Sequence, residues 1–181
     1  MSASILESGD KALHVDGKVL PEWIDFNGHM NVAYYLLAFD RAIDVLWDHV
    51  GITREYVRLR RLSTFAVETH VSYQQELRAG DSYRIVTQLI ALDDKRLHQF
   101  QYMIDADAGH LAATAEWLNL HVNLETRRVC PWPDEIRDSF TAIARAQLNT
   151  DIPEEAGRQI RIQRPLYALQ GYGAECRTLK G

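Results

Sequence analysis

The chain has 181 residues, a formal net charge of −5 at neutral pH, and 46% hydrophobic side chains. Its length predicts one domain with a tail, and its acidic balance argues against a nucleic-acid-binding surface. The two cysteines, Cys130 and Cys176, form no CxxC pair and favour a reducing compartment over a disulfide scaffold. Residues 1–18 lack a continuous apolar run, so we expect a cytoplasmic protein with no signal peptide and no membrane partner.

Residues 12–20 alternate weakly between polar and apolar side chains, which predicts a first strand. A dense polar group follows, made up of Asp25, Asn27, Gly28, His29 and Asn31. One Asp or Asn is enough to cap a helix, so a group of this density indicates a binding or catalytic site. The alternative is a plain capped helix start, in which Gly28 only supplies an unusual backbone angle.

Residues 32–50 are predicted to form a helix with apolar side chains around most of its circumference. Its polar positions form a narrow strip of Asp40, Arg41, Asp44 and Asp48. Gly51 stands where a glycine commonly ends a helix, and the charges exclude a membrane span. A helix that is apolar nearly all round is buried, and its own sheet can cover only part of it. We therefore expect a partner subunit.

Residues 53–61 contain four arginines and are expected to form a solvated connector or a contact with a phosphate group. Turn signals then separate antiparallel strands predicted at 63–78, 82–92, 96–106 and 110–123, with a short fifth at 127–130. The first of these strands should place Phe65, Val67, Thr69, Val71 and Tyr73 on one face, and Ala66, Glu68, His70 and Ser72 on the other.

Residues 134–148 predict a C-terminal helix with one buried side, formed by Ile136, Phe140, Ile143 and Leu148. Residues 149–181 are expected to form a peripheral tail, docked through Ile160 and Ile162. The sum is an α+β fold, in which an antiparallel sheet of about five strands wraps around one long central helix.

This layout, with D-x-x-G-H-M-N across residues 25–31, resembles the hotdog fold and its 4-hydroxybenzoyl-CoA-thioesterase-like branch over residues 15–133. Blocks at 21–30, 67–70 and 94–98 are also similar to betainyl-CoA thioesterases of carnitine breakdown, some of them fused to carnitine dehydrogenases. The resemblance implies a hotdog thioesterase domain at 1–133, with 134–181 as the C-terminal helix and tail. It also implies a homodimer or homotetramer with sites at the subunit interface.

The resemblance implies hydrolysis of a short-chain acyl-CoA, with betainyl-CoA as the candidate substrate in the carnitine branch and Asp25 as general base or nucleophile. Gly28 would let helix-start amides reach the thioester oxygen and stabilise its developing charge. His29 would bond the acyl group or orient Asp25, or else only anchor the turn. Asn27 is either the helix cap or a substrate contact, and Asn31 is placed with it among the substrate-binding residues.

Glu68 and His70 share one strand face, where they complete the neighbour's site or form a polar pair at a dimer seam. A quaternary ammonium group is bound by aromatic faces with an acid. With Glu68 as the counter-charge, the candidate walls are Trp23, Tyr34, Tyr35, Tyr73 and Trp117, which otherwise belong to the core. The candidates for the CoA phosphates are Arg58, Arg60 and Arg61, or Lys95 and Arg96. We expect no cofactor beyond the CoA of the substrate and no metal, because no ligand cluster adds to Asp25 and His29.

Two other functions fit a hotdog domain. Enoyl-CoA hydratases of this fold carry D-x-N-x-x-H, whereas Asp25, Asn27 and His29 give D-x-N-x-H, one residue shorter, so hydration ranks below hydrolysis. A non-catalytic acyl-CoA-binding protein is the second alternative, although the chain has no basic DNA-binding segment of the kind such regulators add.

Overall fold

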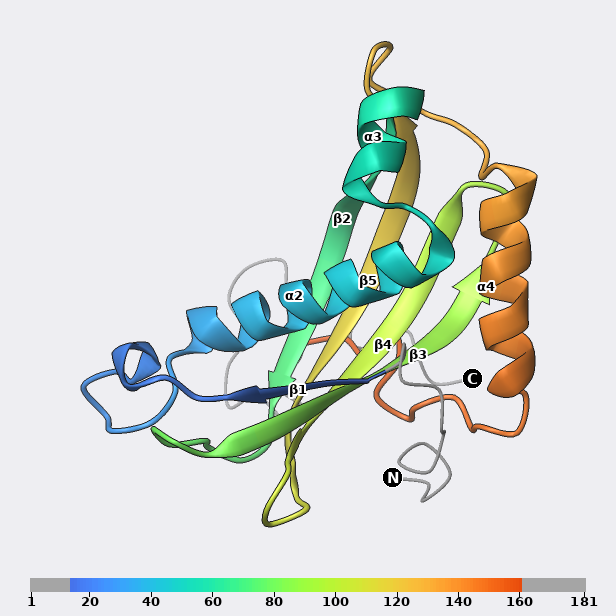
Figure 1. Ribbon diagram of the computed structural model, residues 1–181. Helices are drawn as coiled ribbons and strands as arrows, with labels where there is room; N and C mark the ends of the chain where they lie inside the picture. The colour runs from blue at the N-terminus through green and yellow to red at the C-terminus, as the bar shows by residue number, and fades with distance from the viewer. Residues whose placement is uncertain (1–13, 161–181) are drawn as a thin grey trace, which may run out of the picture.

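A curved antiparallel sheet packs against one long helix in the computed structural model, which describes residues 14–160 (Figure 1). The strands are β1 (His14–Lys18), β2 (Leu62–Tyr73), β3 (Ser82–Leu92), β4 (Arg96–Asp105), β5 (Leu111–Asn123) and β6 (Arg128–Val129). Their order across the sheet is β1-β3-β4-β5-β2, and β6 pairs with β5. The helices are the 3-10 turn η2 (Pro21–Trp23), α2 (Val32–Val50), α3 (Arg54–Arg60) and α4 (Asp134–Ala146). The predicted α+β arrangement around one long helix is confirmed.

Local signals set both ends of α2. The Asn31 side chain accepts a hydrogen bond from the Ala33 backbone N–H, and Gly51 ends the helix at φ 93°. Such a left-handed angle is costly for any residue with a Cβ, which explains the glycine. One side of the helix is buried in the core, including Tyr35, Phe39, Ile43, Leu46 and Val50.

The opposite flank of α2 is not covered within one chain. Val32 is 58% exposed and Leu36 is 40% exposed, although both are apolar. The prediction that the helix is buried nearly all round is therefore wrong for the single chain, whose sheet covers only one side of the helix.

The arginine-rich segment 53–61 is mostly helical, which the sequence did not predict, although its four arginines are exposed to solvent as expected. The Thr53 hydroxyl accepts from the Tyr56 backbone N–H and caps α3, while Tyr56 is buried against the sheet. Arg61 closes the helix in the left-handed region at φ 54°.

Strand β2 contains a bulge that changes which side chains share a face. The register with β5 shifts between Ala66 and Glu68, so one extra residue, Val67, stands in β2. A bulge reverses the alternation, so Phe65 lies on the face of Glu68 and Ala66 on the face of Thr69. The predicted faces are correct from Glu68 onwards and wrong for the two residues before the bulge.

The predicted strand 63–78 is also too long. Strand β2 ends at Tyr73, and the chain then turns inward so that Leu77 is fully buried, with its N–H donating to the Tyr35 hydroxyl at 3.0 Å. The other predicted strands agree with β3, β4, β5 and β6 to within two residues at each end.

Helix α4 extends the core at the C-terminal end of α2 (Figure 1). Its Phe140 ring meets Trp47 edge-on at 6.2 Å, and Ile136 and Ile143 are buried beside it. Leu148 was expected on this buried side but is 77% exposed, because the helix stops at Ala146.

The segment after α4 crosses the sheet face opposite α2, which we call the outer face. Gln88 Nε2 donates to the Asp151 carbonyl at 3.0 Å, and Ala156 packs on the Val86 and Phe100 cluster. Ile160 is 82% exposed, so it does not dock the tail as predicted. The bond from Gln88 and the packing of Ala156 hold the segment instead. The second expected anchor, Ile162, lies outside the described residues.

Candidate functional site

The polar group before α2 forms a tight hairpin across residues 24–30. Ile24 and Met30 form an isolated antiparallel bridge, the Asp25 N–H donates to the His29 carbonyl at 3.0 Å, and the Gly28 N–H donates to the Asp25 carbonyl at 3.0 Å. Gly28 has φ 85°, which glycine adopts without steric cost. Its role is therefore to close the turn. Gly28 stands four residues before the helix begins at Val32, and its expected part in letting helix-start amides reach a thioester oxygen stays a prediction.

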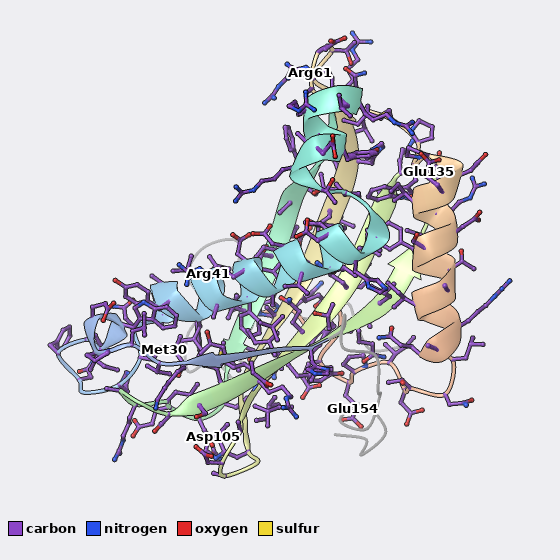
Figure 2. The ribbon with its side chains drawn as sticks, viewed as in Figure 1. Met30, Arg41, Arg61, Asp105, Glu135 and Glu154 are labelled. Atoms are coloured by element: carbon purple, nitrogen blue, oxygen red, sulfur yellow. The ribbon has the colours of Figure 1, made fainter. Side chains whose placement is uncertain are left out.

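Asn31, not Asn27, caps the helix. Its Oδ1 accepts from the Ala33 N–H at 3.0 Å, while its own N–H donates to the Trp23 carbonyl at 2.9 Å. Met30, which sits where the hairpin joins α2 (Figure 2), is buried and donates its N–H to the Leu77 carbonyl. These bonds fix the helix start, and the Val32 N–H has no acceptor among residues 14–160. A free amide at a helix N-terminus attracts negative charge.

Asp25 lies in the hairpin that leads into α2, and one of its carboxylate oxygens is engaged. Its Oδ1 accepts from the Asn27 N–H at 2.8 Å, whereas its Oδ2 has no hydrogen-bond partner within the described part of the chain. His29 Nδ1 lies 3.9 Å from the same Oδ1, which is ion-pair range and too long for a hydrogen bond. The Asp25 side chain is 15% exposed and that of His29 is 34% exposed, so a small molecule can reach both.

The aromatic residues near the hairpin differ in how far they are exposed to solvent. Trp23 is 5% exposed, stacks on Tyr34 with centroids 5.3 Å apart, and lies 6.0 Å from the Arg41 guanidinium carbon. Tyr35 is also buried. Tyr73 is 47% exposed and its hydroxyl donates to the Val32 carbonyl at 3.5 Å. Trp23 and Tyr35 are therefore core residues, and Tyr73 is the aromatic wall open to solvent at the helix start.

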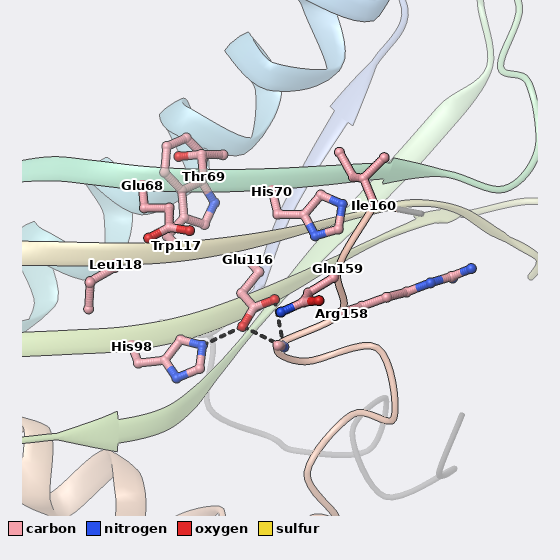
Figure 3. A pocket seen from close by; sticks show the side chains of 11 residues that line it. Glu68, Thr69, His70, His98, Glu116, Trp117, Leu118, Arg158, Gln159 and Ile160 are labelled. Carbon is pink, nitrogen blue, oxygen red and sulfur yellow. Dashed lines mark hydrogen bonds and ion pairs between the residues drawn. The ribbon is translucent and has the colours of Figure 1, made fainter. Parts of the chain in front are cut away.

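Glu68 and His70 lie away from this hairpin, on the outer face. With His98, Glu116 and residues 157–160 they line an outer pocket of about 630 Å³ (Figure 3). Glu116 accepts from the Gly157 N–H at 2.9 Å and lies 2.6 Å from His98 Nε2.

Trp117 points to the opposite face of the sheet, where its Nε1–H donates to Gln101 Oε1 at 2.8 Å beneath α2. The predicted cage of Trp117 with Glu68 as counter-charge is therefore not formed within one chain, because alternate residues of a strand face opposite sides.

A second cavity, of about 480 Å³, lies between α2, α3 and the start of β2. We call it the acidic groove and define it by Asp40, Asp44, Trp47, Trp117 and Asn119. Burial, followed by the neighbouring carboxylates Asp40 and Asp48, raises the pKa of Asp44. In the sequence, Asp40, Asp44 and Asp48 were recognised only as part of the polar strip of the helix and not as part of a cavity. Their spacing of four residues, which aligns them on one helix flank, was the available signal.

The arginines proposed for the CoA phosphates all have carboxylate neighbours. Arg60 Nη2 lies 2.9 Å from Glu135, Arg58 and Arg61 lie within 4.0 Å of Glu55 and Glu125, and Arg96 pairs with Asp93. The assignment of these groups to CoA stays a prediction.

Within residues 14–160 no group of three or more His, Cys, Asp or Glu side chains is arranged to hold a metal ion. None of the helices described there has the length and apolar character to cross a membrane.

The curved sheet around one long helix agrees with comparisons to known proteins. A model of the thioesterase-like superfamily matches residues 19–140. The chain belongs to the thioesterase-like superfamily. This thioesterase is 36% identical over 142 residues to a betainyl-CoA thioesterase of Pseudomonas aeruginosa, covering 78% of this chain and 89% of that relative. The predicted hotdog fold and the predicted class, thioester hydrolase, are confirmed.

Two further relatives support this assignment. The thioesterase is 36% identical over 159 residues to an L-carnitine dehydrogenase/betainyl-CoA thioesterase of Rhizobium meliloti, covering 88% of this chain but 32% of the longer relative. A Staphylococcus aureus protein solved in complex with CoA superposes with a TM-score of 0.77 at 28% identity, covering 83% of this chain and 94% of the other.

Proposed function

We propose that this thioesterase hydrolyses an acyl-CoA, and betainyl-CoA in particular, to the free acid and CoA. The observation that carries the proposal is a carboxylate with one free oxygen, Asp25 Oδ2, at a helix start whose Val32 N–H is unpaired among the described residues. Relatives named for betainyl-CoA and a structural neighbour solved with CoA support the substrate class.

In the proposed reaction the thioester oxygen lies at the N-terminus of α2, where the Val32 N–H and the helix dipole stabilise the oxyanion. Asp25 Oδ2 removes a proton from a water molecule that adds to the carbonyl carbon, or attacks that carbon itself. The carbon–sulfur bond then breaks, and sulfur leaves and takes up a proton as the CoA thiol. In the first route the free acid is formed directly. In the second route the acyl group is left on Asp25 as an anhydride, which water then hydrolyses to the free acid and the Asp25 carboxylate. The bond from Asn27 holds the other carboxylate oxygen in place.

The enzyme is proposed to act as a homodimer joined at β2. This strand has twelve residues, forms one end of the sheet order, and contains no fully buried side chain. Val67 is 52% exposed on it, and Val32 and Leu36 of α2 expose further apolar surface. A long unpaired edge with an apolar flank is the kind of surface that a second copy covers.

A twofold contact at this edge pairs the two β2 strands antiparallel. The Tyr73 end of one strand, next to the helix start, then lies against the Leu62 end of the other. That second end borders the acidic groove, whose lining includes Ser63, Thr64 and Ala66. Each Asp25 hairpin is thereby brought to the groove of the partner chain.

The test is release of free thiol from betainyl-CoA by the wild-type enzyme and by Asp25→Asn. We expect the variant to lose about 100-fold to 10,000-fold in kcat, the usual contribution of a general base, while keeping its fold and dimer. Normal activity of Asp25→Asn would remove Asp25 from the reaction. With crotonyl-CoA, loss of enoyl absorbance without thiol release would indicate hydration, and binding of acyl-CoA without any turnover would indicate a binding protein.

A further inference from the structure

We propose that the acidic groove receives the positively charged end of the acyl group, and that it serves the Asp25 hairpin of the partner chain. This inference rests on the proposed function, since it names the part of the enzyme that selects a cationic acyl-CoA. It assigns this specificity to residues of α2 and β5 and not to Glu68.

The groove carries an excess of negative charge. Asp40, Asp44 and Asp48 follow one another at four-residue spacing along α2, and Arg54 is the one basic side chain among its described lining residues. Like charges at this spacing repel one another, and a bound cation relieves that repulsion.

The remaining walls suit a cation that donates no hydrogen bonds. Trp47 and Trp117 are 8% and 5% exposed, and the Nε1–H of Trp117 is held by Gln101, so the ring that borders the groove is fixed. Aromatic rings together with carboxylates are the usual surroundings of a quaternary ammonium group.

Asn119 is the independent sign that the groove takes a ligand. This side chain lines the groove, is 2% exposed, and has an Nδ2 without a hydrogen-bond partner in the described part of the chain. A buried amide left unpaired is destabilising. The cost is reduced when a ligand, or water held by a ligand, fills the space next to it.

The distance along α2 indicates that the acidic groove and the Asp25 carboxylate of one site belong to different chains. Asp44 lies twelve residues after Val32 on the same helix, or about 18 Å along its axis at 1.5 Å per residue. In a betainyl group one methylene separates the quaternary nitrogen from the carbonyl carbon, so Asp44 lies too far along the helix to hold the nitrogen while the hairpin of the same chain holds the carbonyl group. Antiparallel pairing of the two β2 strands would bring the Asp25 hairpin of one chain close to the acidic groove of its partner.

The first experiment compares betainyl-CoA with 3,3-dimethylbutanoyl-CoA, in which carbon replaces the nitrogen. We expect Asp44→Asn to lower kcat/KM for the cationic ester at least about tenfold more than for the neutral one. Asp138→Asn, a matched exposed carboxylate on α4, should change neither. Equal losses on both esters, or a selective loss in Glu68→Gln instead, would overturn the assignment.

The second experiment tests the partner contribution with purified heterodimers of one Asp25→Asn chain and one Asp44→Asn chain. If each site combines one chain's hairpin with the other's groove, one of the two sites is intact, so about half of the wild-type betainyl-CoA activity returns. If each site lies within one chain, both sites are damaged and activity stays low, which overturns the inference. A wild-type enzyme that releases no thiol from any acyl-CoA would instead refute the proposed function.

Discussion

Replacing Tyr56 by Phe should destabilise the protein through one buried hydrogen bond. His121 is fully buried, and its Nδ1 faces the carbonyl oxygens of Pro131 at 2.9 Å and Cys130 at 3.2 Å. Since a carbonyl oxygen only accepts, Nδ1 must carry the proton, and Nε2 accepts from the Tyr56 hydroxyl at 3.0 Å. Without that hydroxyl, Nε2 becomes a buried acceptor with no donor.

The expected cost is about 1–3 kcal/mol, the penalty for an unpaired buried polar atom, because the substitution removes a single oxygen and opens little space. For a chain of this size about 2 kcal/mol corresponds to a fall in Tm of about 4–8 °C. The assay is urea unfolding at pH 7.5, with the slope m unchanged between wild type and variant.

Tyr73→Phe is the matched control, because its hydroxyl is partly exposed and bonds the Val32 carbonyl at a longer 3.5 Å. Water can replace that bond, so we expect a change of less than about 0.5 kcal/mol. If Tyr56→Phe costs no more than Tyr73→Phe, the deduced protonation of His121 and the importance of its hydrogen bond are both refuted.

Three further predictions concern assembly, backbone and pH. Val67→Lys places a charge on the exposed edge of β2 and should convert the dimer to a monomer by sedimentation, with thiol release reduced; an unchanged dimer would contradict the proposed contact. Gly51→Ala and Gly80→Ala should each cost about 1–2 kcal/mol in urea unfolding, since their φ values are 93° and 90°; a negligible cost at both would refute the backbone argument. Burial lowers the pKa of His121 below 6.5, so unfolded chains bind more protons below that pH. The free energy of unfolding should then fall between pH 7 and 5 by up to about 1.4 kcal/mol per pH unit, and His121→Gln should flatten this slope.

Features set by neighbouring residues could be predicted from the sequence. Helix α2 was located to the residue, because its apolar period and the glycine after Val50 are both local signals. The strands were found through turns rich in Asp and Gly, at residues 79–81, 93–95 and 107–109. Helix α3 was missed, because its many arginines gave no apolar period from which to predict a helix. The Thr53 cap and the buried Tyr56 hold this short helix in place.

The parts of the site that depend on tertiary contacts were harder to predict. The density of polar residues located the hairpin, but the sequence did not show that the Gly28 amide bonds the Asp25 carbonyl and that Asn31 caps the helix. A β-bulge adds one residue without changing composition, so the face of Phe65 was misplaced. The acidic groove joins residues of α2, α3, β2 and β5, and only the folded sheet brings Asn119 next to α2.

The bonds that hold residues 151–157 on the outer face have a consequence for assembly. Asp151 and Gly157 fasten this segment to Gln88 and Glu116, so it stands between the strands and any approaching molecule. Two sheets cannot meet face to face on this side unless the segment is displaced. Residues 151–157 therefore cover this side of the sheet, whereas the proposed β2 contact would lie at an edge that the described chain leaves free.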